Sequence, residues 1–442
     1  MDDATKLKTL YRALDFERPL DIAKPADRAL YVPNLHSSNG LDPIDEMRVH
    51  IENAEQPNSW LFTGHRGVGK STELRRLANE LRTNGFKVAV TDVGEYLNVG
   101  EPISIESLLL TMLAALADWA QTTLGGEQLQ RSYLDRFWRF LQTDIAITEL
   151  SAKTPEGVLS AKAVLSQTPH INDLVRKAVA GATKRLWEKA VAFAGEIVKQ
   201  VRVRYGDETQ VVLILDSLER LRVTGADAQK CYDAISHTFD LNGQFLKLNH
   251  LHVVYSVPPY LPYLIPRVGS YFGYGLFTLP QVKVFETPSD STTVQAAQPC
   301  AAGQALLVQS IQTRYPDVAQ LIPLAMLNEL ALASSGSVRD FFRLIRSACT
   351  KAQITRSALP LADNTVIVLA QQMLRNEMPL ADEDKVWLQK VRASHGTGLD
   401  KISNLHQLAR LFDCGVILSY RNGTDWCDVH YLLHDQLGSQ TP

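Results

Sequence analysis

The sequence contains few cysteines, and their spacing argues against two common uses of this residue. Five cysteines occur among the 442 residues, at Cys231, Cys300, Cys349, Cys414 and Cys427. They are odd in number and show no C-x-x-C spacing, which disfavours both a zinc site and a disulfide framework. Scattered cysteines of this kind are typical of the reducing cytoplasm, and we expect a cytoplasmic protein.

The sequence also lacks a long apolar run, and we expect no secretory signal from its first residues. Its most apolar stretch, residues 108–117, is too short to span a membrane, because a membrane-spanning helix needs about 20 residues. The opening Met1-Asp2-Asp3-Ala4-Thr5-Lys6 carries acid and no apolar stretch, unlike a secretory signal. We therefore expect no membrane partner.

Neither sign of charge is in excess. Lys and Arg number 45 against 48 Asp and Glu, and the formal net charge is −3. With 45% apolar and 21% charged residues, the composition fits a globular protein and excludes a disordered chain or a coiled-coil rod. DNA binding would need a local basic patch. One helical stretch is a candidate, either as a solvated face or as a nucleic-acid contact: Lys177, Lys184, Arg185, Lys189, Lys199, Arg202 and Arg204.

Apolar periodicity predicts an α/β core in residues 58–285, after an N-terminal arm in residues 1–57. The arm has a helix at 5–14 and then four prolines, which favour extended chain. In the core, the run Val211-Val212-Leu213-Ile214-Leu215 is typical of a parallel strand buried on both faces. Further strands are expected at 60–63, 86–90, 251–255 and 281–285, a helix at 72–82, and a long helical insertion at about 100–205 that includes a hairpin within 147–165.

Three further segments are expected after this core. Residues 286–303 are rich in Ser, Thr, Pro, Ala and Gln and predict a linker. Residues 304–360 predict a helical lid, with helices near 304–314, 323–334 and 337–352. Residues 361–442 contain a helix at 405–412 and two strands, 416–420 and 426–430, joined by a turn containing Asn422-Gly423. This last order predicts a winged-helix-like domain.

The strongest chemical signal is a phosphate-binding loop. Residues 64–71 match G-x-x-x-x-G-K-[ST] and lie between a predicted strand and a predicted helix, as the motif requires. Lys70 would reach the β- and γ-phosphates of ATP, and the Ser71 hydroxyl would bind Mg²⁺. The residues expected to bind ATP are Gly64, His65, Arg66, Gly67, Val68, Gly69, Lys70, Ser71 and Thr72.

Two acidic residues follow the buried strand. Asp216 comes directly after the run 211–215 and is predicted to hold Mg²⁺ together with Ser71. Glu219 is the candidate catalytic base that would deprotonate the attacking water. The alternative for Glu219 is a solvated charge in the first turn of a helix, where acidic residues are common.

Two polar residues farther along the chain are candidate sensors of the γ-phosphate. Ser256 ends the strand at 251–255, and Arg339 lies in the first turn of a predicted helix. The alternatives are a strand-ending serine without further role and a surface arginine paired with an acid. Arg66 and Arg220 are candidates for contact with the nucleotide of a neighbouring subunit.

These motifs resemble P-loop ATPases of the AAA+ and STAND kind over about residues 30–350. The run Asp216-Ser217-Leu218-Glu219-Arg220 resembles the D-x-x-[DE]-R strand end of KAP and NACHT-type STAND ATPases. In typical AAA+ proteins the second acid directly follows the first, whereas Ser217 stands there in this chain. Gly336-x-x-Arg339 with a C-terminal winged helix is similar to the replication-initiator clade of AAA+.

More narrowly, residues 63–74 and 422–430 are similar to bacterial ATPases found in antiviral defence loci. This resemblance implies an ATP- and Mg²⁺-dependent switch that forms homo-oligomers and regulates a co-encoded effector protein in antiphage defence. One alternative is a DNA-binding AAA+ loader or a regulator of transposition or replication. Another is a scaffold that binds ATP without hydrolysing it.

Overall fold

The computed structural model places most of the chain in two compact units. One unit comprises Ile44–Thr63 and Leu77–Phe277, and the other comprises Met1–Pro43, Gly64–Arg76 and Thr278–Pro442. The structure describes residues 2–37, 40–97, 102–124, 183–220, 228–288, 298–378 and 380–437, with a few isolated positions between 136 and 177. The hairpin expected within 147–165 falls almost wholly outside the described residues.

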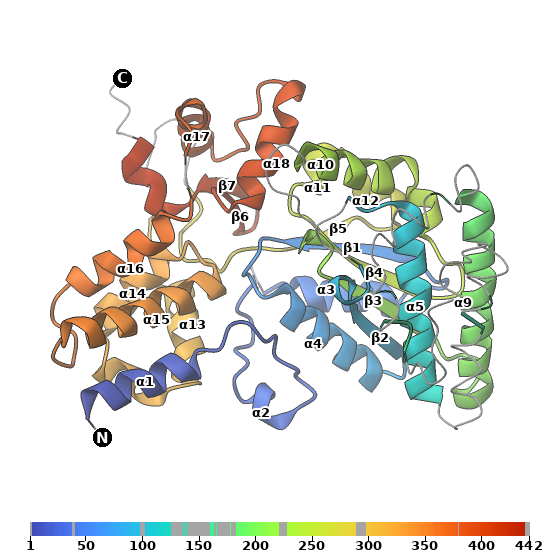
Figure 1. Ribbon diagram of the computed structural model, residues 1–442, viewed down its shortest axis with the longest axis horizontal. Coiled ribbons are helices and arrows are strands. Elements are labelled where there is room, and N and C mark those ends of the chain that lie inside the picture. Colours follow the sequence, from blue (N-terminus) through green and yellow to red (C-terminus); the bar gives the residue numbers. More distant parts are fainter. Residues whose placement is uncertain are drawn as a thin grey trace. The chain divides into compact units, whose positions relative to one another are not determined.

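A five-stranded sheet organises the α/β core (Figure 1). The strands have the order β2-β3-β4-β1-β5. Their bounds are Ser59–Gly64 for β1, Lys87–Asp92 for β2, Val211–Asp216 for β3, His252–Val257 for β4 and Leu276–Leu279 for β5. The pairs β2–β3, β3–β4 and β1–β4 are parallel. The parallel sheet and the strand–loop–helix unit β1–α4 make this an α/β P-loop fold.

Burial explains why these segments form strands. Every residue of β1, β3 and β4 is buried, which confirms the expectation drawn from the continuous apolar run in β3. The register pairs Asp92 with Asp216 and Thr63 with Val257. The carboxyl ends of β2, β3, β4 and β1 therefore lie at one edge of the sheet, where ligands of open α/β sheets bind.

Helices accompany the sheet in the same unit. The long helices α5 (Ile105–Leu124) and α9 (Thr183–Tyr205) pack against each other (Figure 1). Most of α5 is buried, because its side chains are apolar around most of its circumference. The other elements are α3 (Pro43–Glu52), α10 (Ala228–Ser236), α11 (Leu261–Leu264), α12 (Val268–Tyr271), the short 3-10 helices η1 (Val93–Glu95), η4 (Leu218–Arg220) and η7 (Gly243–Leu246), and the π-helix η6 (His237–Leu241).

The second unit contains a helical group that includes the N-terminus. Helix α1 (Asp3–Ala13) packs on α15 (Val338–Thr355) and buries Leu7 and Leu10. The guanidinium of Arg346 in α15 lies 4.0 Å from the ring centre of Tyr11. The group also contains α2 (Pro25–Arg28), α13 (Ala301–Gln312), η8 (Pro316–Gln320), α14 (Leu324–Ala333) and α16 (Thr365–Arg375).

The C-terminal segment of this unit combines two helices with an antiparallel hairpin. Its elements are α17 (Asp382–Ser394), η9 (Ile402–Asn404), α18 (Leu405–Asp413), β6 (Ile417–Arg421), β7 (Asp425–Val429) and η10 (Tyr431–Leu437). Asp384 joins the two helices: its fully buried carboxylate accepts hydrogen bonds from Gln407 at 2.8 Å and Arg410 at 2.6 Å. The expected helix at 405–412 and both expected strands are present, while the winged-helix assignment stays a prediction.

Two segments differ from the expectations. Residues 43–52, expected within an extended arm, form α3, because Pro43 occupies the first turn, where proline is compatible with a helix. Residues 281–285 form no strand. Their backbone groups pair with three separate segments instead of one neighbour: Gln281 N donates to Ser419 O, Val282 N donates to Gly336 O, and Val284 O accepts from Cys300 N.

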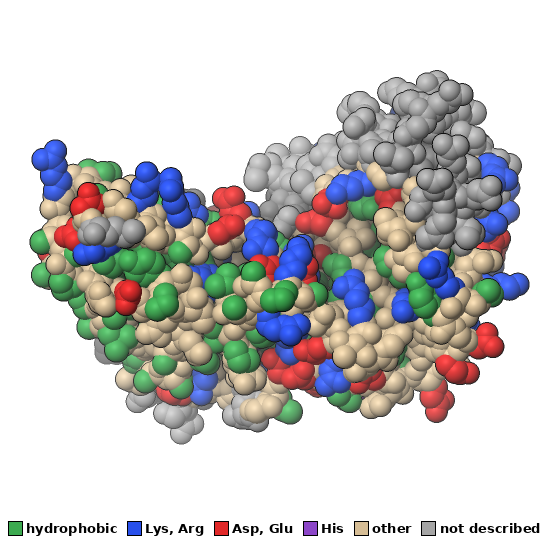
Figure 2. Space-filling view, turned by 90° about the horizontal axis from the view of Figure 1, so that it is seen from below, with side chains coloured by type: hydrophobic (Ala, Val, Ile, Leu, Met, Phe, Trp, Pro, Cys, Tyr) green, Lys and Arg blue, Asp and Glu red, His purple; other side chains and the backbone are tan. Residues whose placement is uncertain are grey.

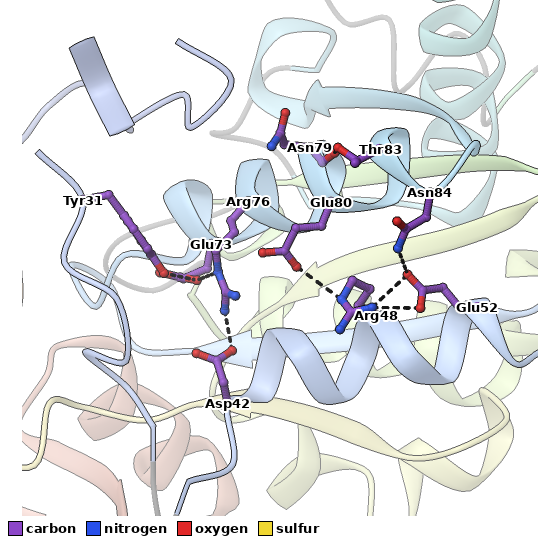
Figure 3. A network of polar contacts seen from close by, with 10 residues as sticks. All are labelled: Tyr31, Asp42, Arg48, Glu52, Glu73, Arg76, Asn79, Glu80, Thr83 and Asn84. Atoms are coloured by element: carbon purple, nitrogen blue, oxygen red, sulfur yellow. Dashed lines mark hydrogen bonds and ion pairs between the residues drawn. The ribbon is translucent and has the colours of Figure 1, made fainter. Parts of the chain in front are cut away.

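Buried and half-buried ion pairs fix helix α4 (Lys70–Thr83) to the preceding chain (Figure 3). In the unit that holds its first half, the Tyr31 hydroxyl donates to Glu73 at 3.1 Å, and Arg76 pairs with Glu73 and Asp42. Burial raises the pKa of Glu73. In the other unit, Arg48 of α3 pairs with Glu52 at 2.8 Å and with Glu80 of α4 at 3.4 Å.

The surface shows no segregation of charge on the face seen in Figure 2. Basic, acidic and apolar side chains intermingle across the described part of that face. On α9, the exposed cations are interrupted by Glu188 and Glu196, and Lys184 approaches Glu188 to 4.0 Å. This pattern favours a solvated helix face over a nucleic-acid contact. Within the described ranges, no helix has the length and apolarity to traverse a bilayer.

Asp384→Ala should destabilise the protein by roughly 2–4 kcal/mol. The substitution leaves Arg410 and Gln407 without their buried acceptor, and the cost is moderated because Arg410 is partly exposed. Asp382→Ala is the matched control, since Asp382 lies in the same helical turn, is 96% exposed and pairs with Lys385; its effect on the free energy of unfolding should be much smaller, because exposed ion pairs contribute little. Chemical denaturation measures both, and equal effects would contradict the assigned role of Asp384.

Buried titratable groups in the C-terminal segment couple its stability to pH. Burial lowers the pKa of His430 to about 3 and that of His434 to about 4. Burial also raises the pKa of Asp428 to about 7. The Asp428 carboxylate lies 3.9 Å from His434 Nε2 and 4.0 Å from His395 Nδ1.

The melting temperature should therefore fall as the pH is lowered from 7 to 5. A histidine with a depressed folded-state pKa takes up its proton preferentially in the unfolded state, so stability is lost below the ordinary value of about 6.5. Asp428 opposes this trend, because between its ordinary pKa of 3.8 and about 7 the folded state binds the extra proton. Asp428→Asn should steepen the fall, and a melting temperature that stays level or rises toward pH 5 would contradict the account.

Candidate nucleotide-binding site

The phosphate loop joins the end of β1 to the start of α4. Gly67 and Gly69 have φ angles of +88° and +111°, in the left-handed region that glycine adopts at little cost. Gly69 O then accepts the amides of Thr72 at 3.0 Å and Glu73 at 3.1 Å, which begins the helix. The two glycines therefore give the backbone the curvature that a phosphate-binding loop needs.

Lys70 holds the loop in this shape. Its ammonium donates to Gly64 O at 2.8 Å and to His65 O at 3.0 Å, and only 4% of the residue is exposed. Two of the three ammonium donors are thus used to close the loop. Ser71, in the first turn of α4, is partly exposed, as a hydroxyl that binds a metal ion must be.

The side chain of His65 is directed at the C-terminal segment. Its Nε2 accepts the amide proton of Ser419 at 3.0 Å, and its ring stacks on Phe412 with 5.5 Å between centroids. Burial, with a smaller contribution from the Lys70 charge, lowers the pKa of His65 to about 3, so the ring is neutral. Arg66, next in the loop, is exposed.

The N-terminus of α15 lies against the same loop. Arg339 N donates to Gly67 O at 3.1 Å. A Cβ atom on Gly67 would lie 2.9 Å from Arg339 Cβ and 2.9 Å from Ser337 Oγ, so glycine is required for this approach as well as for its φ angle. Ser337 caps α15 by accepting the amide of Asp340. The structure thus brings Arg339 next to the phosphate loop, as a sensor residue requires.

The N-terminal segment covers another side of the loop. His36 Nδ1 contacts Pro280 O at 3.0 Å, and its Nε2 lies 3.7 Å from the position of a Cβ on Gly69. Burial lowers the pKa of His36 to about 4. The Thr72 hydroxyl accepts the amide of Leu20 at 3.1 Å, which ties the segment to α4.

In the other unit, polar groups occupy the carboxyl ends of β2 and β3. Asp216 is 7% exposed, and Ser217, directly after it, has a φ angle of +73°. The buried Ser217 hydroxyl donates to Asp92 Oδ2 at 3.1 Å, while Asp92 Oδ1 accepts the amide of Gly94 at 2.9 Å. The sequence analysis did not select Asp92. The feature that could have indicated it is its position, as an acidic residue shortly after the predicted strand at 86–90.

Glu219 and Ser256 are joined directly. The Ser256 hydroxyl donates to Glu219 Oε2 at 3.0 Å, and Ser256 is fully buried in β4. The 3-10 helix η4 that contains Glu219 begins immediately after the left-handed residue Ser217, so the backbone reversal there directs Glu219 back to the neighbouring strand. The side chain of Arg220 lies outside the described part of the chain.

The residues predicted to bind Mg²⁺ supply suitable ligands. Ser71 offers a hydroxyl and Asp216 a carboxylate, the oxygen ligands that Mg²⁺ prefers. Asp216 is largely buried at the end of a strand, which fixes its carboxylate. Among the described residues, no cluster of three or more His, Cys, Asp or Glu side chains is arranged to bind a metal by itself.

Comparisons with known proteins give distant structural similarity only. No protein-family model matches the sequence, and no curated protein matches it. The chain is similar to the Thermotoga maritima RuvB Holliday junction branch migration motor, with 14% identity, a TM-score of 0.34, and coverage of 92% of this chain and 99% of that chain. It is also similar to the Aeropyrum pernix ORC2 protein in ADPNP–ADP complexes, with 11% identity, a TM-score of 0.36, and coverage of 92% and 95%. At these values the similarity has no weight in the assignments that follow.

Proposed function

We propose that this protein is an ATP-binding and ATP-hydrolysing molecular switch of the P-loop class. The observation that carries the proposal is the loop at 64–71, with left-handed glycines at 67 and 69 and Lys70 bonded to Gly64 O and His65 O. Such a loop directs backbone amides at a phosphate group, and the N-terminus of the 14-residue helix α4 adds its positive dipole.

The proposed hydrolysis uses residues of the loop and of the strand ends. Lys70 contacts the β- and γ-phosphates, and Ser71 and Asp216 hold Mg²⁺, which neutralises phosphate charge when bound. Glu219 accepts the proton of the attacking water. The Ser256 hydroxyl donates to Glu219 and so orients its carboxylate, which gives Ser256 a positioning role beside the expected sensor role.

The biological role that we propose for this ATPase rests on the resemblance of its sequence motifs to AAA+ and STAND ATPases. We propose that ATP promotes assembly into homo-oligomers, with Arg66 and Arg220 as candidates for contact with a neighbouring nucleotide. Arg339 would sense the γ-phosphate, since its backbone already contacts Gly67. A co-encoded effector protein in antiphage defence is the proposed partner.

A DNA-binding loader or regulator is the second candidate. The order of α17, α18 and the β6–β7 hairpin, which suits a winged helix, favours it. The alternation of acids and cations on α9 weighs against it. Stimulation of ATP hydrolysis by duplex DNA would favour this candidate, stimulation by a co-encoded or viral protein would favour the switch, and binding without turnover would favour a scaffold.

Lys70→Ala should weaken ATP binding by about 10–150-fold, because a charge-assisted hydrogen bond contributes about 1.5–3 kcal/mol and the alanine also removes the brace of the loop. Isothermal titration with ATP measures the affinity. Lys385→Ala, which removes an exposed lysine of α17, is the control and should bind like the wild type. Unchanged affinity in Lys70→Ala would contradict the site.

Glu219→Gln should bind ATP with nearly normal affinity and hydrolyse it about 10²–10⁴-fold more slowly, because glutamine cannot accept the proton of water. Ser256→Ala should show a smaller loss, since Glu219 remains but its hydrogen-bond donor is removed. Phosphate release under saturating ATP and Mg²⁺ measures both rates. Wild-type turnover in Glu219→Gln would place the catalytic base elsewhere.

A further inference from the structure

The β6–β7 hairpin contacts the phosphate loop through one buried side chain of the loop. His65 Nε2 accepts the amide proton of Ser419 in β6 at 3.0 Å, and the His65 ring lies nearly parallel to that of Phe412, with 13° between the planes. Both His65 and Phe412 are buried. A backbone amide of the C-terminal segment therefore donates a hydrogen bond to the loop that is proposed to bind phosphate.

The backbone N–H of Ser419 points away from β7 and can therefore make this contact. Ser419 pairs with Cys427, and Cys427 N donates away from β6, to His395 O. Ser419 O in turn accepts the amide of Gln281. Ser419 and Cys427 are thus a non-hydrogen-bonded pair of the antiparallel ladder, in which the N–H and C=O groups point outward. The outer edge of β6 is used for the phosphate loop and for the segment after β5.

A second connection leads from the hairpin to Gly67. The Tyr420 hydroxyl donates to Ser335 O at 3.0 Å, and Tyr431 N donates to Ser335 Oγ at 2.8 Å. Ser335 is buried with a φ angle of +52°, an uncommon conformation for a residue other than glycine. It lies just before α15, whose Arg339 amide binds Gly67 O. Hairpin contacts therefore reach the loop at two positions.

The His65 ring makes this contact in its neutral form. Because Nε2 accepts a hydrogen bond, the single N–H hydrogen of the neutral ring is on Nδ1. With a pKa lowered to about 3 by burial, the ring keeps this form at physiological pH. The side chain thus acts as a hydrogen-bond acceptor and a stacking surface, and it adds no positive charge to the loop.

We propose that His65 is a positioning residue through which the β6–β7 hairpin holds the phosphate loop in its nucleotide-binding shape. This inference rests on the proposed nucleotide binding. In the docked arrangement, Gly67 and Gly69 are left-handed and Lys70 closes the loop, so docking favours the binding-competent state. By thermodynamic linkage, nucleotide binding then strengthens the docking of the hairpin by the same factor. The C-terminal segment thereby senses whether the loop is occupied.

Substitutions at both ends of the contact test the proposal. Ser419→Pro removes the amide that His65 accepts while sparing the ladder bonds to β7, because proline is tolerated where the N–H points outward on an edge strand. His65→Phe keeps the aromatic stack and removes the acceptor. Ser419→Ala keeps the amide and removes only the longer contact between Ser419 Oγ and His65 Nε2 at 3.3 Å, so it is the matched comparison. ADP affinity by titration and amide hydrogen exchange of residues 417–421, with and without ADP, are measured in the full-length chain.

In the wild type, ADP should slow exchange in residues 417–421. Ser419→Pro and His65→Phe should weaken ADP binding about fivefold or more and lose most of this protection, whereas Ser419→Ala should retain it. Circular dichroism verifies folding, and His65→Phe alone decides the matter if Ser419→Pro fails to fold. Wild-type affinity and protection in His65→Phe would overturn the inference while leaving the nucleotide site intact. A wild-type chain that binds neither ATP nor ADP would overturn the proposed function itself.

Discussion

Two hydrogen bonds from the Lys70 ammonium to Gly64 O and His65 O close the phosphate loop, and the surrounding contacts depend on this closed shape. A Cβ on Gly64 would lie 2.7 Å from Leu279 O, and one on Gly67 would lie 2.9 Å from Arg339 Cβ. Glycine therefore serves two purposes here: it permits the backbone curvature that suits a phosphate, and it lets neighbouring chain approach the loop. The loop is both the candidate binding site and a packing element of its unit.

The contacts at the carboxyl end of β3 show how Ser217, an unusual residue at this position, is accommodated. Ser217 stands where the resembled AAA+ proteins carry their second acid. It adopts a left-handed φ angle and donates to Asp92, an acceptor on the neighbouring strand, whose other oxygen is already bonded to Gly94. The chain then turns into η4, and Glu219 meets Ser256. Such strain is retained where surrounding contacts determine it, which is common at functional sites. The hydrogen bond from Ser256 thus fixes the orientation of the carboxylate that we propose as the catalytic base.

The sequence predicted what is encoded locally. The loop motif, the helix that follows it, and the strand Val211–Asp216 each have a signal within a few neighbouring residues. Asp92, Ser419 and Ser335 have none, because their roles come from residues 125, 354 and 85 positions away, namely Ser217, His65 and Tyr420. Distant partners also explain why the strand predicted at residues 281–285 does not form. The apolar pattern of these residues suits a strand, but their backbone groups are bonded to three different segments.

A buried neutral histidine suits a link between loop and hairpin better than a charged residue would. A cation at position 65 would have to be desolvated, and it would repel Lys70, whose charge already lowers the pKa of His65. A carboxylate would compete with phosphate for the Lys70 ammonium. The imidazole avoids both costs, yet its Nε2 still accepts a directed hydrogen bond from Ser419. Because a hydrogen bond weakens steeply outside a narrow range of distance and angle, a substantial shift of the loop must either move the hairpin or break the bond. The proposed nucleotide binding and the docking of the C-terminal segment therefore depend on the same side chain.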